Sequence, residues 1–173
     1  MSEPHGRPQF CQRCGSPLAP REEEGRTRLA CAGTSERASC GFVHYVNPTP
    51  VVAAIVQQGE HVILVRNHGW PETWYALVTG FLETNETPEE GILRELGEEL
   101  GMKGEIRALV GNYAFAQKNE VILAYHVEVP AGDPTLGAEL AAYKRVPIAK
   151  LKPWPFATGE AVRDWLAKVR PTT

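Results

Sequence analysis

The chain has 173 residues, of which 43% are hydrophobic and 23% charged, with a formal net charge of -3. This composition is typical of a globular protein with room for one ordinary domain and a small additional module. The weak negative charge argues against a general nucleic-acid binder, and no apolar run approaches the ~20 residues of a membrane helix. The first ten residues, MSEPHGRPQF, lack the pattern of a signal peptide, so we expect a cytoplasmic protein.

All four cysteines lie within the first 40 residues, at Cys11, Cys14, Cys31 and Cys40. Without an export signal a metal site is favoured over disulfides, and four thiolates favour a closed, structural zinc site. Cys11 to Gly15 has the form of a zinc knuckle, and Cys40-Gly41 repeats half of it. His44 in place of one cysteine, independent free thiols and a rubredoxin-like iron site remain alternatives. We predict a zinc ribbon over residues 1–46.

The stretch REEEGRTR, residues 21–28, is highly charged and is predicted to be the exposed tip of a hairpin in this ribbon. Residues 45–50 contain two prolines and are predicted to form an extended linker. We therefore place a domain boundary near residue 47, with a second domain over residues 47–173.

The second domain begins with a continuous apolar run at residues 51–56, which is typical of a strand buried on both faces. A second strand is predicted at residues 61–66, a loop at 67–73 and a further strand at 75–78. Arg66 ends a strand and is a candidate phosphate ligand or a surface residue. Trp70 and Trp74 are candidates for stacking on a base, or for packing.

A helix is predicted from Pro88 to Leu100. Thr87 is a suitable N-cap, Glu90 completes a capping box, and Gly101 offers a left-handed stop. The apolar residues Ile92, Leu93, Leu96 and Leu100 predict a core face. Glu95, Glu98 and Glu99 share another face, where like charges repel and Arg94 offsets only part of that repulsion. A Mg²⁺ or Mn²⁺ ion is one compensation, and a plain solvated face is the alternative.

The spacing around this helix resembles the Nudix box at all nine of its fixed positions. These positions are Gly80, Glu86, Arg94-Glu95-Leu96, Glu98-Glu99 and Gly101-Met102. The resemblance implies an α/β fold, an α/β/α sandwich with a mixed sheet, and hydrolysis of a nucleoside diphosphate linked to another group.

The resemblance also implies roles for single residues. Glu98 and Glu99 would be the principal ligands of Mg²⁺ or Mn²⁺, and Glu95 a further ligand or the base that activates water. Glu86 and Arg94 would pair and hold the loop against the helix. A second glycine precedes the box in many family members, and its carbonyl reaches the metal; here that position is Thr79, next to Gly80.

The order of ribbon, linker and Nudix domain also resembles the NADH pyrophosphatase branch, for which a homodimer is expected. That branch carries a Ser-Gln-Pro-Trp-Pro-Phe motif shortly after the box, but here the corresponding stretch is residues 113–117, which does not match. A Pro-Trp-Pro-Phe sequence occurs only later, at residues 153–156.

After the box, strands are predicted at residues 106–110 and 121–129, joined by a bridge at 111–120. Candidate substrate contacts are an aromatic wall from Tyr113, Phe115 and Tyr125, and a phosphate contact from Lys118. Glu120 and Glu139 are candidate acidic residues for the metal site, and in the Nudix family a late acid such as Glu139 acts as ligand or base. A final amphipathic helix is predicted at residues 158–169, with Ala161, Val162, Trp165, Leu166 and Val169 on its buried side.

We therefore expect a Mg²⁺- or Mn²⁺-dependent Nudix hydrolase that also holds structural Zn²⁺. NADH, ADP-ribose and related ADP-linked nucleotides are the leading substrates, and a capped RNA end is also possible. Two alternatives remain open: a nucleotide-sensing regulator that binds without turnover, and a zinc-ribbon interaction module in which the Nudix domain is a scaffold.

Overall fold

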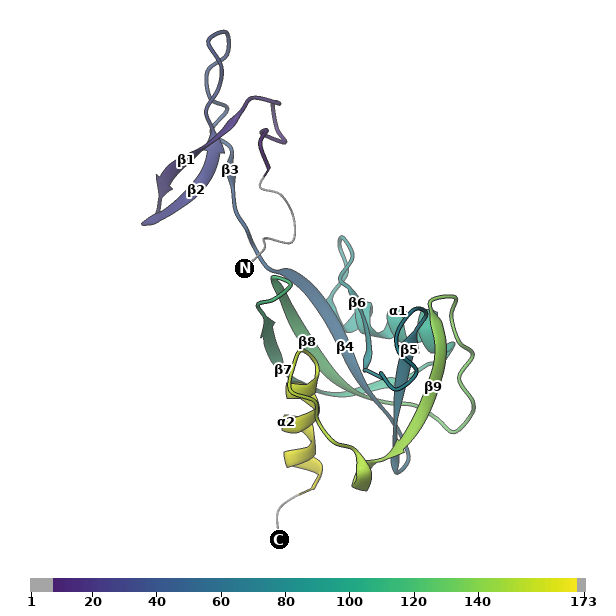
Figure 1. Ribbon diagram of the computed structural model, residues 1–173. Helices are drawn as coiled ribbons and strands as arrows, with labels where there is room; N and C mark the ends of the chain where they lie inside the picture. The colour runs from purple at the N-terminus through teal and green to yellow at the C-terminus, as the bar shows by residue number, and fades with distance from the viewer. Residues whose placement is uncertain (1–7, 171–173) are drawn as a thin grey trace. The chain divides into compact units, whose positions relative to one another are not determined.

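The computed structural model describes residues 8–170, which fall into two compact units divided between Asn47 and Pro48 (Figure 1). The first unit holds a three-stranded antiparallel sheet of β1 (Leu18–Glu23), β2 (Arg26–Cys31) and β3 (Val43–His44). Glu24 and Gly25 both have positive φ and turn β1 into β2, as two-residue hairpin loops require. The predicted hairpin at residues 21–28 is therefore confirmed.

The second unit contains a six-stranded mixed sheet and two helices. Five strands are hydrogen-bonded in the order β7-β8-β4-β5-β9. The sixth, β6, pairs with the first half of β4, whereas β5 pairs with its second half. Only β4 and β8 run parallel; the other pairs are antiparallel. The strands are β4 (Thr49–Gln58), β5 (His61–Asn67), β6 (Val78–Phe81), β7 (Glu105–Phe115), β8 (Glu120–Glu128) and β9 (Leu140–Pro147).

Strand β4 lies in the middle of the sheet and is buried on both faces, as its continuous apolar run predicts. Val52, Ala54 and Val56 belong to one hydrophobic core, whereas Val51, Ala53 and Ile55 belong to the other. The alternation follows from the two-residue period of a strand.

The helices α1 (Pro88–Leu100) and α2 (Gly159–Val169) cover opposite faces of this sheet (Figure 1). Ile92, Leu96 and Leu100 of α1 are fully buried in the first of the two cores. Ala161, Val162, Trp165 and Leu166 of α2 are buried in the second. A three-layer α/β/α arrangement with a mixed sheet is therefore confirmed.

Two apolar residues expected in these helix cores are exposed instead. Leu93 is 38% exposed and Val169 is 41% exposed. Leu93 is not among the buried residues of α1, and Val169 is the last residue of α2. Helical periodicity gives a residue's direction but not the width of the surface that covers it.

Several strand boundaries also differ from those predicted. The strand expected at 75–78 is shifted to Val78–Phe81, because those residues pair with Val51–Ala54 of β4. The bridge expected at 111–120 is mostly strand, since β7 continues to Phe115 through two register shifts. The linker predicted at 45–50 ends earlier, because Thr49 and Pro50 already pair with β8.

Within residues 8–170, no helix has both the length and the apolar character needed to cross a bilayer.

We predict that Leu96→Ala lowers the free energy of unfolding of the second unit by about 2–5 kcal/mol, because it leaves a cavity under α1. Leu93→Ala on the same helix is the matched control and should change that free energy by less than about 1 kcal/mol, because Leu93 is already partly exposed. All four tryptophans lie in the second unit, so urea unfolding followed by tryptophan fluorescence reports on it alone. Equal losses in the two variants would contradict the prediction.

Candidate functional site

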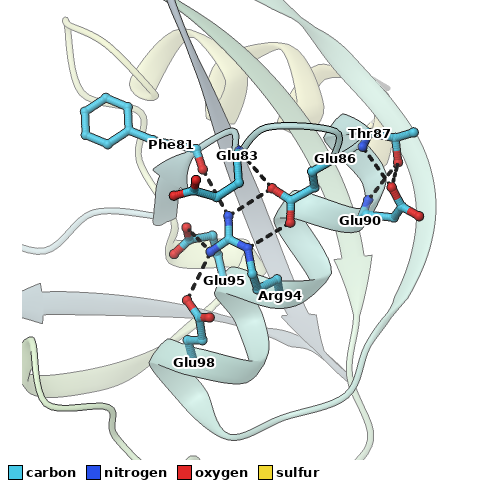
Figure 2. A network of polar contacts seen from close by, with 8 residues as sticks. All are labelled: Phe81, Glu83, Glu86, Thr87, Glu90, Arg94, Glu95 and Glu98. Carbon is cyan, nitrogen blue, oxygen red and sulfur yellow. Dashed lines mark hydrogen bonds and ion pairs between the residues drawn. The ribbon is translucent and has the colours of Figure 1, made fainter.

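The loop between β6 and α1 is fixed by the start of the helix. The Thr87 hydroxyl accepts a hydrogen bond from the backbone N–H of Glu90, and the Glu90 carboxylate accepts one from the N–H of Thr87 (Figure 2). This is the predicted capping box, and Gly101 ends the helix in the left-handed conformation with φ 62°. The helix thus spans the predicted residues, and its register sets the direction of every glutamate on it.

Arg94 connects the loop to the helix. Its Nε and Nη2 donate to the two carboxylate oxygens of Glu86 at 2.8 and 3.0 Å, and Nη2 also donates to the Phe81 carbonyl at 3.0 Å (Figure 2). Such a bidentate pair is stronger and more directional than a single ion pair. The Arg94 guanidinium and the N–H of Glu83 hold the pKa of Glu86 below its usual value.

Arg94 also contacts two glutamates of its own helix. Its Nη1 donates to Glu95 at 2.7 Å and to Glu98 at 3.0 Å. The acids beside Arg94 raise its pKa further above the ordinary value. One cation thus faces three carboxylates, which leaves the surrounding negative charge largely uncompensated.

Gly80 allows Glu95 to lie directly against β6. A Cβ at residue 80 would lie 1.9 Å from the carboxyl carbon of Glu95, so a side chain there would displace the Glu95 carboxylate from β6. Thr79 precedes it in the same strand, and extended backbone suits a β-branched residue. A threonine at this position, which precedes the box and is a glycine in many family members, is therefore compatible with the strand.

These residues border a cleft of about 610 Å³ in the second unit. The cleft collects residues from β6, α1, the β7–β8 turn and the segment before β9. The predicted site residues that line it are Thr79, Gly80, Arg94, Glu95, Glu98, Glu99, Lys118, Glu120 and Glu139. Residues more than 50 positions apart in the sequence are thus brought to one surface.

Glu99 is the most buried acid of the cleft, at 9% exposure, and its Oε2 has no hydrogen-bond partner among the described residues. Burial, together with the charges of Glu95, Glu139 and Glu98, raises the pKa of Glu99 to about 8. Burial likewise raises the pKa of Glu95, although Arg94 opposes the shift. A buried carboxylate oxygen without a donor, among other acids, fits a bound divalent cation.

The carboxylates are spread more widely than the ligands of a closed metal cage. Among the described residues, the four cysteines are the one group of three or more His, Cys, Asp or Glu side chains that brings its ligand atoms together. Mg²⁺ retains several waters and shares ligands with substrate phosphates, so widely spaced carboxylates suit it.

Three predicted substrate contacts lie outside this cleft. Tyr113 and Phe115 pack at the α2 core, and the Tyr113 hydroxyl donates to Asp164 of α2 at 3.0 Å. Arg66 follows Val65, which faces the α1 core, so alternation along β5 directs Arg66 to the opposite face. These residues belong to the side of the sheet away from the glutamates.

Other aromatic candidates are also absent from the residues that line the cleft. Tyr125 is buried under α1 and donates its hydroxyl to Glu89 at 2.8 Å. Trp70 and Trp74 lie in the loop after β5 and are exposed. The Pro-Trp-Pro-Phe sequence at 153–156 precedes α2, where Trp154 packs against the α2 core.

Phe81 and Glu83 line the cleft and were not among the predicted site residues. Phe81 is 58% exposed at the end of β6, immediately after Gly80. Figure 2 shows its ring directed away from the glutamate and arginine side chains while its carbonyl faces Arg94. The sequence feature that could have identified Phe81 is its position as a large aromatic residue directly after Gly80, the first residue of the box.

The four cysteines form a second candidate site, in the first unit. All four Sγ atoms lie within 4.8 Å of one another, and the Cys11–Cys40 and Cys14–Cys31 pairs are each 3.6 Å apart. Sulfurs around a tetrahedral zinc ion lie about 3.8 Å apart, whereas a disulfide is about 2.05 Å long. The Ser16 hydroxyl and backbone N–H lower the pKa of Cys14 to about 6. The Phe42 backbone N–H lowers the pKa of Cys40, but burial and the three neighbouring thiols outweigh it and raise that pKa to about 11. His44 is not part of the cluster.

The protein-family model of the NUDIX domain matches residues 47–167 of the chain. The chain is 32% identical over 130 residues to the NAD-capped RNA hydrolase NudC of Chromobacterium violaceum, covering 72% of this chain and 44% of the relative. It is 27% identical over 138 residues to the mitochondrial NAD(P)H pyrophosphatase NUDT13 of Homo sapiens, covering 79% and 37%. The chain thus spans less than half the length of the curated relatives it matches.

Solved structures show the same fold. A NUDIX hydrolase from Nitrosomonas europaea superimposes with a TM-score of 0.69 at 27% identity, over 83% of this chain and 80% of that one. An ADP-ribose pyrophosphatase from Streptococcus suis superimposes with a TM-score of 0.60 at 17% identity, over 73% and 96%.

We predict that metal-free protein loses stability as pH rises from about 5 to 8, through Glu99. Its pKa of about 8 in the folded chain exceeds the ordinary value of 4.5, so the folded state binds more protons in this range and the free energy of unfolding falls with pH. Mg²⁺ binds the deprotonated acid, so the increase in Tm caused by Mg²⁺ should grow over the same range.

Glu99→Gln tests this assignment, because it removes the Glu99 carboxylate and leaves the groups outside the cleft unchanged. The Tm of the metal-free variant should fall less steeply with pH than that of the wild type. Identical pH dependence in the two proteins, measured by thermal unfolding with and without Mg²⁺, would contradict the assignment.

Proposed function

Because the chain belongs to the NUDIX family, we propose that it is a Mg²⁺- or Mn²⁺-dependent pyrophosphohydrolase that cleaves the diphosphate bridge of an ADP-linked nucleotide. The observation that carries the proposal is the cleft in which Glu95, Glu98, Glu99 and Glu139 meet. Glu99 is buried there without a donor, which is an arrangement that a divalent cation stabilises.

Glu98 and Glu99 are the proposed principal metal ligands. Glu99 lines the cleft and has a buried carboxylate oxygen without a hydrogen-bond partner. Glu98 is the more exposed of the two, so its carboxylate can leave Arg94 and bind a metal ion instead. When bound, the ions would neutralise the charge that develops on the phosphate oxygens and would favour deprotonation of the attacking water.

Glu139 is the proposed acceptor of the proton from that water. Its carboxylate has no hydrogen-bond or ion-pair partner among the described side chains, whereas Glu95 is held by Arg94 at 2.7 Å. Water attacks one phosphorus as its proton passes to Glu139, and the bond from that phosphorus to the bridging oxygen breaks. The products are two phosphate monoesters, and the bridging oxygen leaves with one of them.

An ADP-linked compound such as NADH or ADP-ribose is the proposed substrate class. Lys118 reaches the cleft from the β7–β8 turn and provides a cation for the diphosphate. Phe81 provides an exposed aromatic surface on which a base or nicotinamide ring can stack. Two relatives are named as an NAD-capped RNA hydrolase and an NAD(P)H pyrophosphatase. These names support the same substrate class and also make capped RNA ends candidate substrates.

We further propose that residues 1–46 form a zinc ribbon and residues 47–173 the hydrolase domain. The four sulfurs have the spacing of a tetrahedral zinc site. Gly15 and Gly41 follow Cys14 and Cys40 with φ of 75° and 77°, which allows each knuckle to turn back toward the sulfurs. The module is small, so Zn²⁺ would supply much of its folding free energy.

With Mg²⁺ or Mn²⁺, we predict turnover of at least one of NADH, NAD, ADP-ribose, a dinucleoside tetraphosphate, a capped RNA or a nucleoside triphosphate. Glu98→Gln and Glu99→Gln should each lower kcat by about 100-fold or more, because each removes a charge that holds the metals. Glu105→Gln on the surface of β7 is the matched control and should retain wild-type kcat. Phosphate-monoester release measures all four proteins.

Two outcomes decide between the enzyme and the alternatives. Loss of turnover in the two helix variants but not in the control supports hydrolysis at this cleft. Absence of turnover with both metals, together with a nucleotide-induced increase in Tm, would replace the enzyme with a nucleotide-binding regulator.

We predict one zinc ion per chain by elemental analysis. Cys40→Ser should lower the zinc content below half of the wild-type value, because one thiolate of four is lost, whereas His44→Ala should leave it unchanged. Zinc retained in Cys40→Ser but lost in His44→Ala would contradict the four-cysteine assignment.

A further inference from the structure

Glu139 lies on an irregular segment of residues 129–139, between β8 and β9, rather than on a helix or strand. Nothing in the secondary structure of this segment fixes a side chain against the glutamates of α1. Its position in the cleft must therefore come from tertiary contacts of the segment itself.

The segment attaches to the C-terminal end of α1 through two backbone hydrogen bonds. The N–H of Thr135 donates to the Leu100 carbonyl at 2.8 Å, and the N–H of Gly137 donates to the Glu99 carbonyl at 2.9 Å. These carbonyls lie in the last turn of the helix, where no intrahelical donor is available. The segment that carries Glu139 thus completes the end of the helix that carries Glu98 and Glu99.

Gly137 makes the closest approach in this attachment. A Cβ at residue 137 would lie 2.3 Å from the Glu98 carbonyl oxygen and 3.3 Å from the Glu99 Cα. The first distance is about 1 Å shorter than an ordinary contact, and both neighbours are backbone atoms in a helix. Any side chain at residue 137 must therefore move the segment away from α1.

Two further contacts link this attachment to Glu139. The N–H of Leu140 donates to the Gly137 carbonyl at 3.1 Å, closing a turn around Glu139, and the N–H of His68 donates to the Glu139 carbonyl at 3.0 Å. A displacement at Gly137 is thus transmitted through one short turn to Glu139.

Arg145 of β9 holds the other end of the segment. Its Nη2 donates to the Gly132 carbonyl at 2.6 Å and to Asp133 at 2.9 Å, and its Nε donates to Gln58 at 2.6 Å. Gln58 itself donates to the carbonyls of Pro130 and Gly132. The segment is therefore held at both ends.

We propose that Gly137 is a positioning residue: it lets the segment before β9 pack against the last turn of α1 and so places Glu139 beside Glu98 and Glu99. Arg145 supports the same placement from the opposite end. The inference rests on the proposed hydrolase function, in which Glu139 accepts the proton of the attacking water.

A double-mutant cycle of the full chain tests this inference, with wild type, Gly137→Ala, Glu139→Gln and the double variant. Gly137→Ala should lower kcat by about 10- to 100-fold, because a shift of about 1 Å misplaces the acceptor, and should change KM by less than about 3-fold. In the Glu139→Gln background the same change should alter kcat by less than about 2-fold, because Gly137 acts through Glu139. Equal kcat losses in the two backgrounds, or no loss in either, would overturn the proposal.

Gly97→Ala is the matched control. It adds the same methyl group to α1 where no atom lies within 4 Å, so kcat should remain at the wild-type value. Arg145→Met replaces Gly137→Ala in the cycle if the latter does not fold, with the same dependence on Glu139 expected.

Mn²⁺ binding measured by calorimetry on the same four proteins separates this inference from the proposed function. Displacing or neutralising Glu139 removes negative charge beside the ions, so either single variant should weaken Mn²⁺ binding severalfold and the double variant no further. If the wild type hydrolyses nothing, the proposed function fails and the Mn²⁺ cycle alone decides the inference: additive losses overturn it, and non-additive losses support it.

Discussion

Repulsion among carboxylates that share one cleft is the constraint on which the second unit depends. Glu95, Glu98, Glu99 and Glu139 face one cleft, and Arg94 is already shared among Glu86, Glu95 and Glu98. Burial of Glu99 increases the electrostatic cost, as its raised pKa shows. Such a cluster opposes folding, and a bound cation would offset that cost. The surrounding fold must therefore hold the acids together against this repulsion.

Four structural features do this. The capping box and the Glu86–Arg94 pair fix the loop against the start of α1. Gly80 brings β6 close enough for Glu95 to lie on it, and Gly137 does the same for the segment before β9 at the helix end. In both places a Cβ would lie closer than 2.5 Å to another atom. The absence of a side chain is thus what permits the charges to approach.

The first unit presents a related problem with different chemistry. Among its described residues, the first unit buries three hydrophobic side chains, those of Cys11, Ala30 and Cys31. Four thiols at 3.6 to 4.8 Å are held by short turns at Gly15 and Gly41 rather than by a core. In both units, groups that would repel one another when ionised are gathered by backbone turns and glycines, in the arrangement that a metal ion stabilises.

The sequence by itself determined the local features. Local features depend on residues within a few positions of one another, so periodicity and spacing were sufficient to predict them. They are the capping box, the limits of α1 and the burial of β4 on both faces. The spacing of the box also identified the glutamates of α1, since a helix fixes their relative directions.

Tertiary structure decided which distant residues meet at the cleft. Tyr113 and Phe115 fall on the far face because β7 continues through two register shifts to Phe115, which no local pattern marks. Phe81 lies at the cleft because β6 begins three residues later than its apolar pattern predicts. Glu139 lies in the same cleft as the α1 glutamates, and its segment is attached to α1 by backbone contacts of Thr135 and Gly137. These placements depend on pairing between segments that are far apart in the chain. The periodicity of a single sequence describes each segment separately and does not show which segments pair.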